Sequence, residues 1–222
     1  MGRKQGMRLI TLLFILSLMQ CACFGCQCRR KRHLQEAFCG SAFVINGKVI
    51  TDQLKLPIGR ELQNSTVPTT PQPPLWKFDR IYDVNVTEVF KVPVNVVLNP
   101  GDVIQAVTRA AGSLCGGYLP LDTELTITGG GVNDHGQLTF GLCSHTEQGL
   151  TSYQLKGLRG GYSCECLTES RSFKKLQCLL NTLPGYNTDC LLKYGVCKKV
   201  QNQTCEWEVG IHDACVYNPV IG

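Results

Sequence analysis

Apolar and polar residues alternate along several stretches of the first 140 residues, and this pattern predicts strands. The clearest stretch is 81–97, which is rich in Val, Ile, Tyr and Phe and alternates over much of its length. Because period-two alternation is typical of a strand with one buried face, we expect one long strand there, or two with a break near Pro93. Further strands are predicted at 43–50, with a bend or bulge at Asn46-Gly47, and at 102–108, 125–128 and 138–142.

Two short helices are also predicted. Leu34, Ala37 and Phe38 share one face of a helix that runs into Cys39, and 147–159 has the spacing of an amphipathic helix. The segment 64–74 is expected to be a loop, because its four prolines exclude a central strand. About five strands and two short helices indicate a mainly β protein, a small barrel with helices at its side.

The N-terminal residues have the pattern of a signal peptide. Three basic residues precede the apolar run Leu9–Met19, which is shorter than the roughly 20 residues that span a bilayer. Small residues after this run predict cleavage after Gly25; a buried N-terminal strand or helix is the alternative. The mature chain would then begin at Cys26 and be secreted, and no second apolar run predicts a membrane span.

Composition changes this picture little except through cysteine. Cleavage after Gly25 would remove three basic residues and no acidic one, lowering the net charge from +5 to +2, so the charge gives no reason to expect a nucleic-acid partner. The chain has 14 cysteines in 222 residues, and 12 would remain in the mature chain, an even number typical of a fully bridged secreted protein. Three triplets are glycosylation acceptors, at Asn64, Asn85 and Asn202.

No catalytic residue stands out. The four histidines are scattered, and no His-Glu-x-x-His, Gly-x-Ser-x-Gly or phosphate-loop pattern occurs. This argues against the common zinc hydrolases, serine hydrolases and nucleotide enzymes. The Cys-x-Cys pairs at Cys26 and Cys164 leave two alternatives, metal-binding thiolates or disulfide halves, and an oxidising compartment favours disulfides.

Seven short segments occur in a characteristic order: Cys26-x-Cys28, Gln35–Ser41, Val44–Val49, Ile81–Val84, Ser113–Gly116, Leu138–Cys143 and Cys164-x-Cys166. Together they resemble the tissue inhibitors of metalloproteinases, members of the netrin-like module superfamily. The resemblance implies an OB-like five-stranded β-barrel followed by a small disulfide-rich C-terminal subdomain. The expected divisions are a signal peptide at 1–25, an inhibitory netrin-like domain at 26–164 and the subdomain at 165–222.

The resemblance also implies disulfide pairs. In the barrel these are Cys26–Cys115, Cys28–Cys143 and Cys39–Cys164, and the segment Cys197–Trp207 implies Cys166–Cys205. The remaining cysteines are then expected to pair as Cys190–Cys197 and Cys178–Cys215, although six cysteines allow 15 arrangements.

The function that the resemblance implies is inhibition of zinc metalloendopeptidases. These partner proteases would be secreted or membrane-anchored. The free α-amino nitrogen and the carbonyl oxygen of Cys26 would chelate the catalytic zinc of the protease and displace its water. The chain would need no cofactor of its own. The expected protease-binding residues are Cys26, Gln27, Cys28, Arg29, Gly112, Ser113 and Leu114. The alternative is a netrin-like module that binds matrix or a growth factor without inhibiting.

The sequence departs from the family pattern beside the expected N-terminus. Gln27 replaces the usual Thr or Ser at the residue expected to enter the protease specificity pocket, so we expect it to control selectivity. The run Arg29–Arg32 replaces a Pro-containing stretch. Four successive cations favour a solvated loop; a site for sulfated glycosaminoglycan or a processing site after Arg32 are the alternatives.

Overall fold

The computed structural model describes residues 26, 28, 33–56, 74–166, 168, 178, 188–200 and 204–209. The predicted signal peptide, Gln27, the basic run Arg29–Arg32 and the acceptors Asn64 and Asn202 lie outside these residues. The division between residues 164 and 165 stays a prediction.

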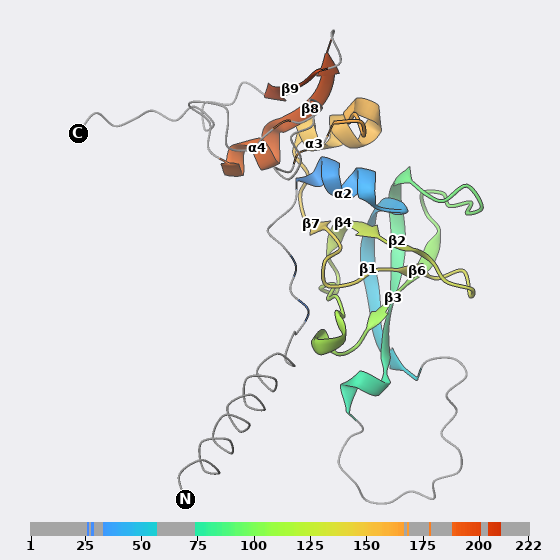
Figure 1. Cartoon of the computed structure of the whole chain (residues 1–222). Helices are drawn as coiled ribbons and strands as arrows, with labels where there is room; N and C mark the ends of the chain where they lie inside the picture. Colours follow the sequence, from blue (N-terminus) through green and yellow to red (C-terminus); the bar gives the residue numbers. More distant parts are fainter. Residues whose placement is uncertain are drawn as a thin grey trace, which may run out of the picture.

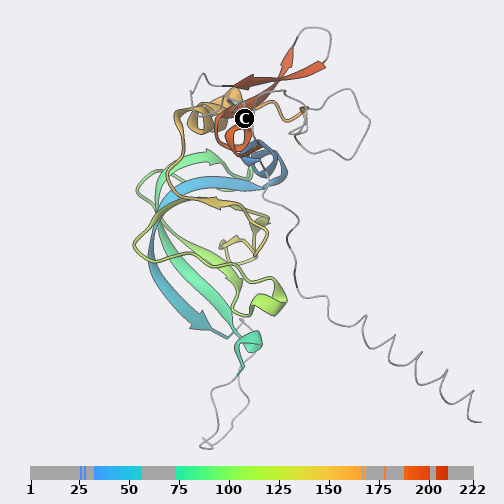
Figure 2. The same ribbon diagram turned by 90° about the vertical axis from the view of Figure 1, so that its left-hand side faces the viewer.

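The barrel is one curled sheet. Its strands are β1 (Phe43–Lys55), β2 (Asp79–Lys91), β3 (Val103–Arg109), β4 (Glu124–Gly129), β5 (Gly131–Val132), β6 (Leu138–Thr139) and β7 (Thr146–Glu147), in the order β5-β6-β3-β2-β1-β4-β7. All neighbours are antiparallel except β3 and β6. The sheet wraps round on itself (Figure 2), which confirms the expected mainly β, OB-like architecture.

Strand β1 shows how the sequence curls the sheet. Its pairing with β2 shifts register at Asn46/Gly47, the predicted bulge, and bulges increase local twist and bend a strand. A Cβ at Gly47 would lie 2.6 Å from a methyl carbon of Val84, so glycine lets the two strands approach. The alternating residues of β2 fill the interior, where Tyr82, Val84 and Val86 are at most 1% exposed.

Short helices lie around the sheet. They are α2 (Leu34–Gly40), α3 (Ser152–Lys156), the π-helical turn η3 (Gly157–Gly161), and the 3₁₀ turns η1 (Leu75–Lys77) and η2 (Gly112–Leu114). Figure 1 shows α2 between the sheet and the C-terminal elements. Those elements are α4 (Thr188–Tyr194) and the hairpin of β8 (Gly195–Val200) and β9 (Thr204–Val209).

Three predicted elements need correction. The stretch 81–97 forms a strand only to Lys91, and 138–142 only to Thr139. The helix predicted at 147–159 begins at Ser152. Gly149 has a left-handed φ of +68°, and Thr151 and Gln154 form a capping box that starts the helix there. The preceding residues extend instead and pair with β4 as β7.

The tail disulfides also differ from expectation. Cys166–Cys205 is present, but Cys178 pairs with Cys197, with Cα atoms 5.9 Å apart. The predicted pairs Cys190–Cys197 and Cys178–Cys215 are therefore wrong. Cys190 is disulfide-bonded as well. The pairing depends on how β8 packs, and cysteine spacing carries no information about that packing.

All described cysteines are bridged, so the metal-thiolate alternative is wrong for them. The sulfur atoms of Cys166, Cys197 and Cys205 lie within 4.8 Å of one another, but they belong to two adjacent disulfides and not to a ligand set. Within the described ranges, no helix combines the length and apolar character that a bilayer crossing needs.

Candidate functional site

The first part of the site is a tight turn that follows β3. Backbone N–H groups of Leu114 and Gly116 donate to the carbonyl of Ala111, at 3.0 and 3.2 Å, and the N–H of Cys115 donates to Gly112 at 3.0 Å. Cys115 has a left-handed φ of 63°. A Cβ on Gly116 would lie 1.9 Å from the carbonyl oxygen of Arg109, so only glycine fits there. The turn therefore has one strongly determined backbone conformation.

The second part is the turn 141–144, which lies against the first. The N–H of Leu142 donates to the carbonyl oxygen of Cys115 at 2.7 Å, and the Ser144 hydroxyl accepts from the N–H of Gly141 at 3.0 Å. Each turn carries a cysteine, Cys115 in one and Cys143 in the other. The two cysteines are thus presented side by side by a hydrogen-bonded pair of turns.

Two disulfides attach the predicted mature N-terminus to these turns. Cys26 is bonded to Cys115 and Cys28 to Cys143, and the Cα atoms are 5.2 Å apart in each pair. The sulfur of Cys26 lies 3.6 Å from the carbonyl oxygen of Ser113. Because bridges at residues 26 and 28 leave a single residue between them, the start of the segment has little freedom to fray.

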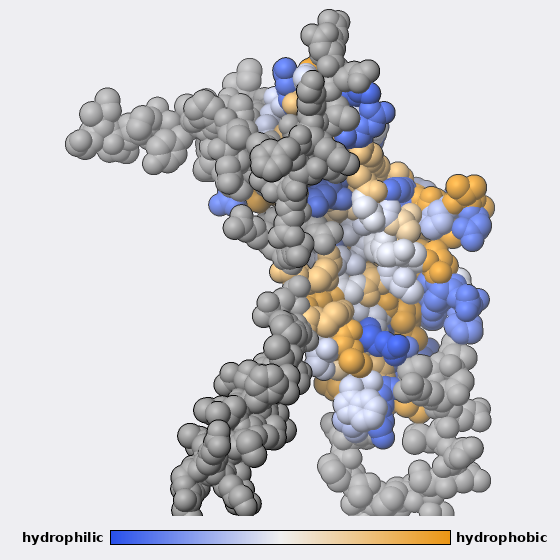
Figure 3. Space-filling model, viewed as in Figure 1, coloured by the Kyte–Doolittle hydropathy of each residue, from blue (hydrophilic) through white to orange (hydrophobic). Residues whose placement is uncertain are grey.

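The surface that results is exposed and without charged side chains. We call it the ridge: Cys26, Cys28, Gly112–Cys115 and Leu142–Cys143. Leu114 is 45% exposed and Leu142 is 43% exposed. The barrel shows apolar surface at several places in the space-filling view (Figure 3). The four cysteines of the ridge are disulfide-bonded, and none of its other side chains is ionisable. Its side chains therefore offer apolar contacts, beside polar backbone groups, rather than acid–base chemistry.

The structure brings three further predicted site residues together with Cys26 and Cys28, and it does not describe the other two. Gly112, Ser113 and Leu114 lie beside the Cys26–Cys115 bridge, as the site requires. Gln27 and Arg29 fall outside the described residues, so their roles, and the glycosaminoglycan alternative for Arg29–Arg32, stay predictions.

Sequence reasoning missed Leu142. Its signal is weak but present, since Leu142 directly precedes Cys143 as Leu114 directly precedes Cys115. Only the hydrogen bond from Leu142 to Cys115 shows that the two leucines belong to one surface.

The candidate glycosylation residue Asn85 lies in β2, away from the ridge. It pairs with Lys48 of β1 and Val103 of β3, and Val103 is 60% exposed. Val103 begins β3, whereas the ridge turn follows the other end of that strand, about 20 Å further along at 3.3 Å per residue. Use of Asn64, Asn85 and Asn202 stays a prediction.

A family model described as tissue inhibitor of metalloproteinase matches residues 24–207, a span that includes the ridge, the barrel and the C-terminal hairpin as far as Trp207. The search of the curated proteins finds no match.

Proposed function

The chain belongs to the tissue inhibitor of metalloproteinase family, and we propose that its ridge inhibits zinc metalloendopeptidases by occupying the open coordination position of their catalytic zinc. The family is one of inhibitors, not enzymes, and its partners are metalloproteinases. The observation that carries the proposal is the pair of disulfides that fixes Cys26 and Cys28 on two hydrogen-bonded turns.

The mechanism requires a free α-amino group at Cys26. We propose that the chain is secreted and that cleavage after Gly25 creates this group, whose ordinary pKa of about 7.7–8 leaves a minor but accessible fraction of it unprotonated near neutral pH. The α-amino nitrogen and the carbonyl oxygen of Cys26 can together bind one zinc ion in a five-membered chelate. A catalytic zinc keeps one position for water, and this chelate would displace that water and remove the nucleophile.

Rigidity is the second requirement. Binding loses free energy when a flexible segment must be ordered, and a segment that is already fixed avoids that loss. The bridges close long loops, with sequence separations of 89 and 115 residues. The zinc belongs to the protease, so this mechanism needs no cofactor of the chain itself.

The test of the proposal is inhibition of a panel of zinc endopeptidases by the purified secreted protein. Inhibition that is stoichiometric and competitive with substrate supports it. If the correctly bridged protein inhibits none of them, the non-inhibitory netrin-like binding module becomes the better hypothesis.

Replacing Leu142 by Ala is expected to weaken inhibition about tenfold. An exposed leucine that becomes buried in a complex contributes on the order of 1.5 kcal/mol, and 1.4 kcal/mol corresponds to tenfold in affinity. Stability should change by no more than about 0.5 kcal/mol, because the side chain is exposed in the free protein. Inhibition constants and urea denaturation measure the two effects. Val97→Ala is the control, since Val97 is 89% exposed in the loop between β2 and β3. If both variants lose the same amount of inhibition, Leu142 is not part of the binding surface.

Replacing Gln27 by Thr is expected to redistribute inhibition among proteases. Gln27 would enter the specificity pocket, and Thr is shorter and less polar, so pockets of different depth should respond differently. Inhibition constants across the panel are the measurement. A uniform change across all proteases, or a large loss of thermal stability with no kinetic change, would show that Gln27 does not select targets.

A further inference from the structure

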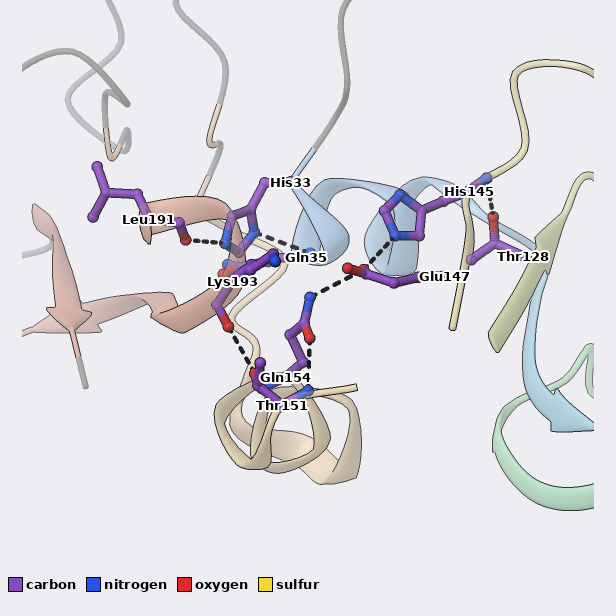
Figure 4. Close-up of polar contacts among 9 residues, drawn as sticks. All are labelled: His33, Gln35, Thr128, His145, Glu147, Thr151, Gln154, Leu191 and Lys193. Atoms are coloured by element: carbon purple, nitrogen blue, oxygen red, sulfur yellow. Dashed lines mark hydrogen bonds and ion pairs between the residues drawn. The ribbon is translucent and has the colours of Figure 1, made fainter. Parts of the chain in front are cut away.

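A buried clasp joins the barrel to the C-terminal elements. Its two residues are His33, which precedes α2, and Gln35 in the first turn of α2; they are 1% and 0% exposed. Figure 4 shows the His33 ring directed toward Leu191 of α4. The contacts join residues more than 150 positions apart in the sequence.

Gln35 holds the edge of β8. Its Oε1 accepts from the N–H of Cys197 at 2.9 Å, and its Nε2 donates to the carbonyl of Cys197 at 2.8 Å. The same Nε2 donates to the carbonyl of Ser163 at 2.9 Å. The amide thus pairs with one residue of β8 as a neighbouring strand would, on the edge that β9 does not cover.

His33 has both ring nitrogens engaged. Nδ1 accepts from the N–H of Gln35 at 3.1 Å and so caps α2, while Nε2 lies 3.1 Å from the carbonyl of Leu191 and 3.0 Å from that of Gly195. A backbone N–H can only donate and a carbonyl can only accept. His33 must therefore be neutral, with its proton on Nε2.

Further contacts reinforce this junction. The hydroxyl of Thr151 donates to the carbonyl of Lys193 at 2.7 Å. An apolar cluster joins α2, β1, η3 and β8. Its buried members are Leu34, Val44, Leu158, Tyr162 and Val196. The clasp is the polar part of an extensive contact and not an isolated bond.

The clasp lies next to the inhibitory segment in the chain. Only four residues separate Cys28, fixed on the ridge by its disulfide, from His33, fixed by α4 and β8. We propose that His33 and Gln35 are positioning residues through which the C-terminal subdomain steadies the N-terminal segment, and that the clasp closes only while His33 is neutral. Its effect on inhibition rests on the function proposed above; its acid sensitivity does not.

Among the residues that the structure describes, no carboxylate forms an ion pair with the His33 ring, and Glu147 acts on it only as a weaker, more distant charge. Carbonyl oxygens face it from α4 and β8. The ring of Trp207 in β9 lies tilted against it, with 5.1 Å between the ring centroids, and the ring of Tyr162 lies at 6.1 Å. His145, which precedes β7, and Glu147 at the end of β7 also lie nearby, but the Glu147 carboxylate already accepts from Gln154 and contacts His145, each at 3.0 Å. On α2 itself, Glu36 accepts from Thr168 at 3.5 Å.

Burial therefore lowers the pKa of His33 from 6.5 to about 4, and the hydrogen bonds to Leu191 and Gly195 oppose this shift only in part. An opened clasp exposes His33 with an ordinary pKa near 6.5. The closed form then binds fewer protons than the open form between pH 4 and 6.5. The stabilisation is complete above about pH 6.5 and is lost as the pH falls toward 4.

Hydrogen exchange of the mature full-length protein tests the acid sensitivity. Amides in 188–200 are followed by mass spectrometry at pH 7.5 and 5.0 and corrected for intrinsic exchange rates. The pKa values of 6.5 and about 4 give an opening constant roughly 30-fold larger at pH 5.0 than at pH 7.5. His33→Gln keeps a donor near the two carbonyls but cannot titrate, so its opening should be higher at pH 7.5 and nearly independent of pH.

Two histidine controls identify the titrating group. His135→Gln, at an exposed turn, and His145→Gln should both keep most of the pH dependence of the wild type. A wild-type opening constant that does not change with pH would overturn the proposal. So would a dependence that persists in His33→Gln or disappears in His145→Gln.

Inhibition at pH 7.5 tests the positioning role separately. Gln35→Met removes the paired hydrogen bonds to Cys197 but keeps similar volume, and it should weaken inhibition about tenfold. The comparison is a core variant, Val49→Ala, chosen for a similar loss of stability. If both variants inhibit alike, the clasp is structural only. If the wild type inhibits nothing, the proposed function fails while the exchange experiment still decides the acid sensitivity.

Discussion

Acetylation of the Cys26 α-amino nitrogen, or one extra residue before it, is expected to reduce inhibition at least about 100-fold. Either change turns the amine into an amide, whose nitrogen has no available lone pair for a metal. The added atoms would also occupy the space that the zinc and its ligands need. A 100-fold loss corresponds to about 2.7 kcal/mol of binding free energy, which is modest for the loss of a coordination bond.

The fold should be unaffected by this change, because the bridges Cys26–Cys115 and Cys28–Cys143 and the barrel interior are the same. The measurement is the inhibition constant of the extended protein beside its parent, with peptide mapping of the disulfides in both. N-terminal sequencing of the natural protein should begin Cys-Gln-Cys. Cleavage after Cys21 or Ala22, or full potency of the extended variant, would refute chelation by the α-amino group.

Replacing Gly116 by Ala should damage both the fold and the ridge. The new Cβ would meet the carbonyl oxygen of Arg109 at 1.9 Å and that of Ala111 at 3.0 Å. Neither oxygen can move easily, since Arg109 ends β3 opposite Asp79 and Ala111 accepts the bonds that form the turn. We expect a loss of about 3 kcal/mol in the free energy of unfolding, and at least a tenfold loss of inhibition because Cys115 is displaced.

Gly130→Ala is the matched control, because a Cβ at Gly130 has no atom within 4 Å. Urea denaturation and inhibition constants for both variants make the comparison. If Gly116→Ala has the same free energy of unfolding and the same inhibition constants as the wild type, the conformation of this turn does not determine the ridge.

Local pattern in the sequence determined most of the sheet and the first helix. Alternation placed β1 to β4, the bulge at Asn46-Gly47 and the interior face of β2, because period-two burial is a property of the strand itself. The helix after His33 followed from three apolar residues on one face. The ordered cysteines and their flanking segments indicated the family and the barrel disulfides.

Tertiary structure alone decided the contacts between distant segments. It made residues 146–147 a strand because β4 offers an edge there, paired Cys178 with Cys197, and set Leu142 against Cys115. It also joined His33 and Gln35 to α4 and β8 across more than 150 residues. The physical reason is the same in each case: sequence periodicity reports which face of an element is buried, whereas its partner is chosen by register, turn geometry and packing of the folded chain.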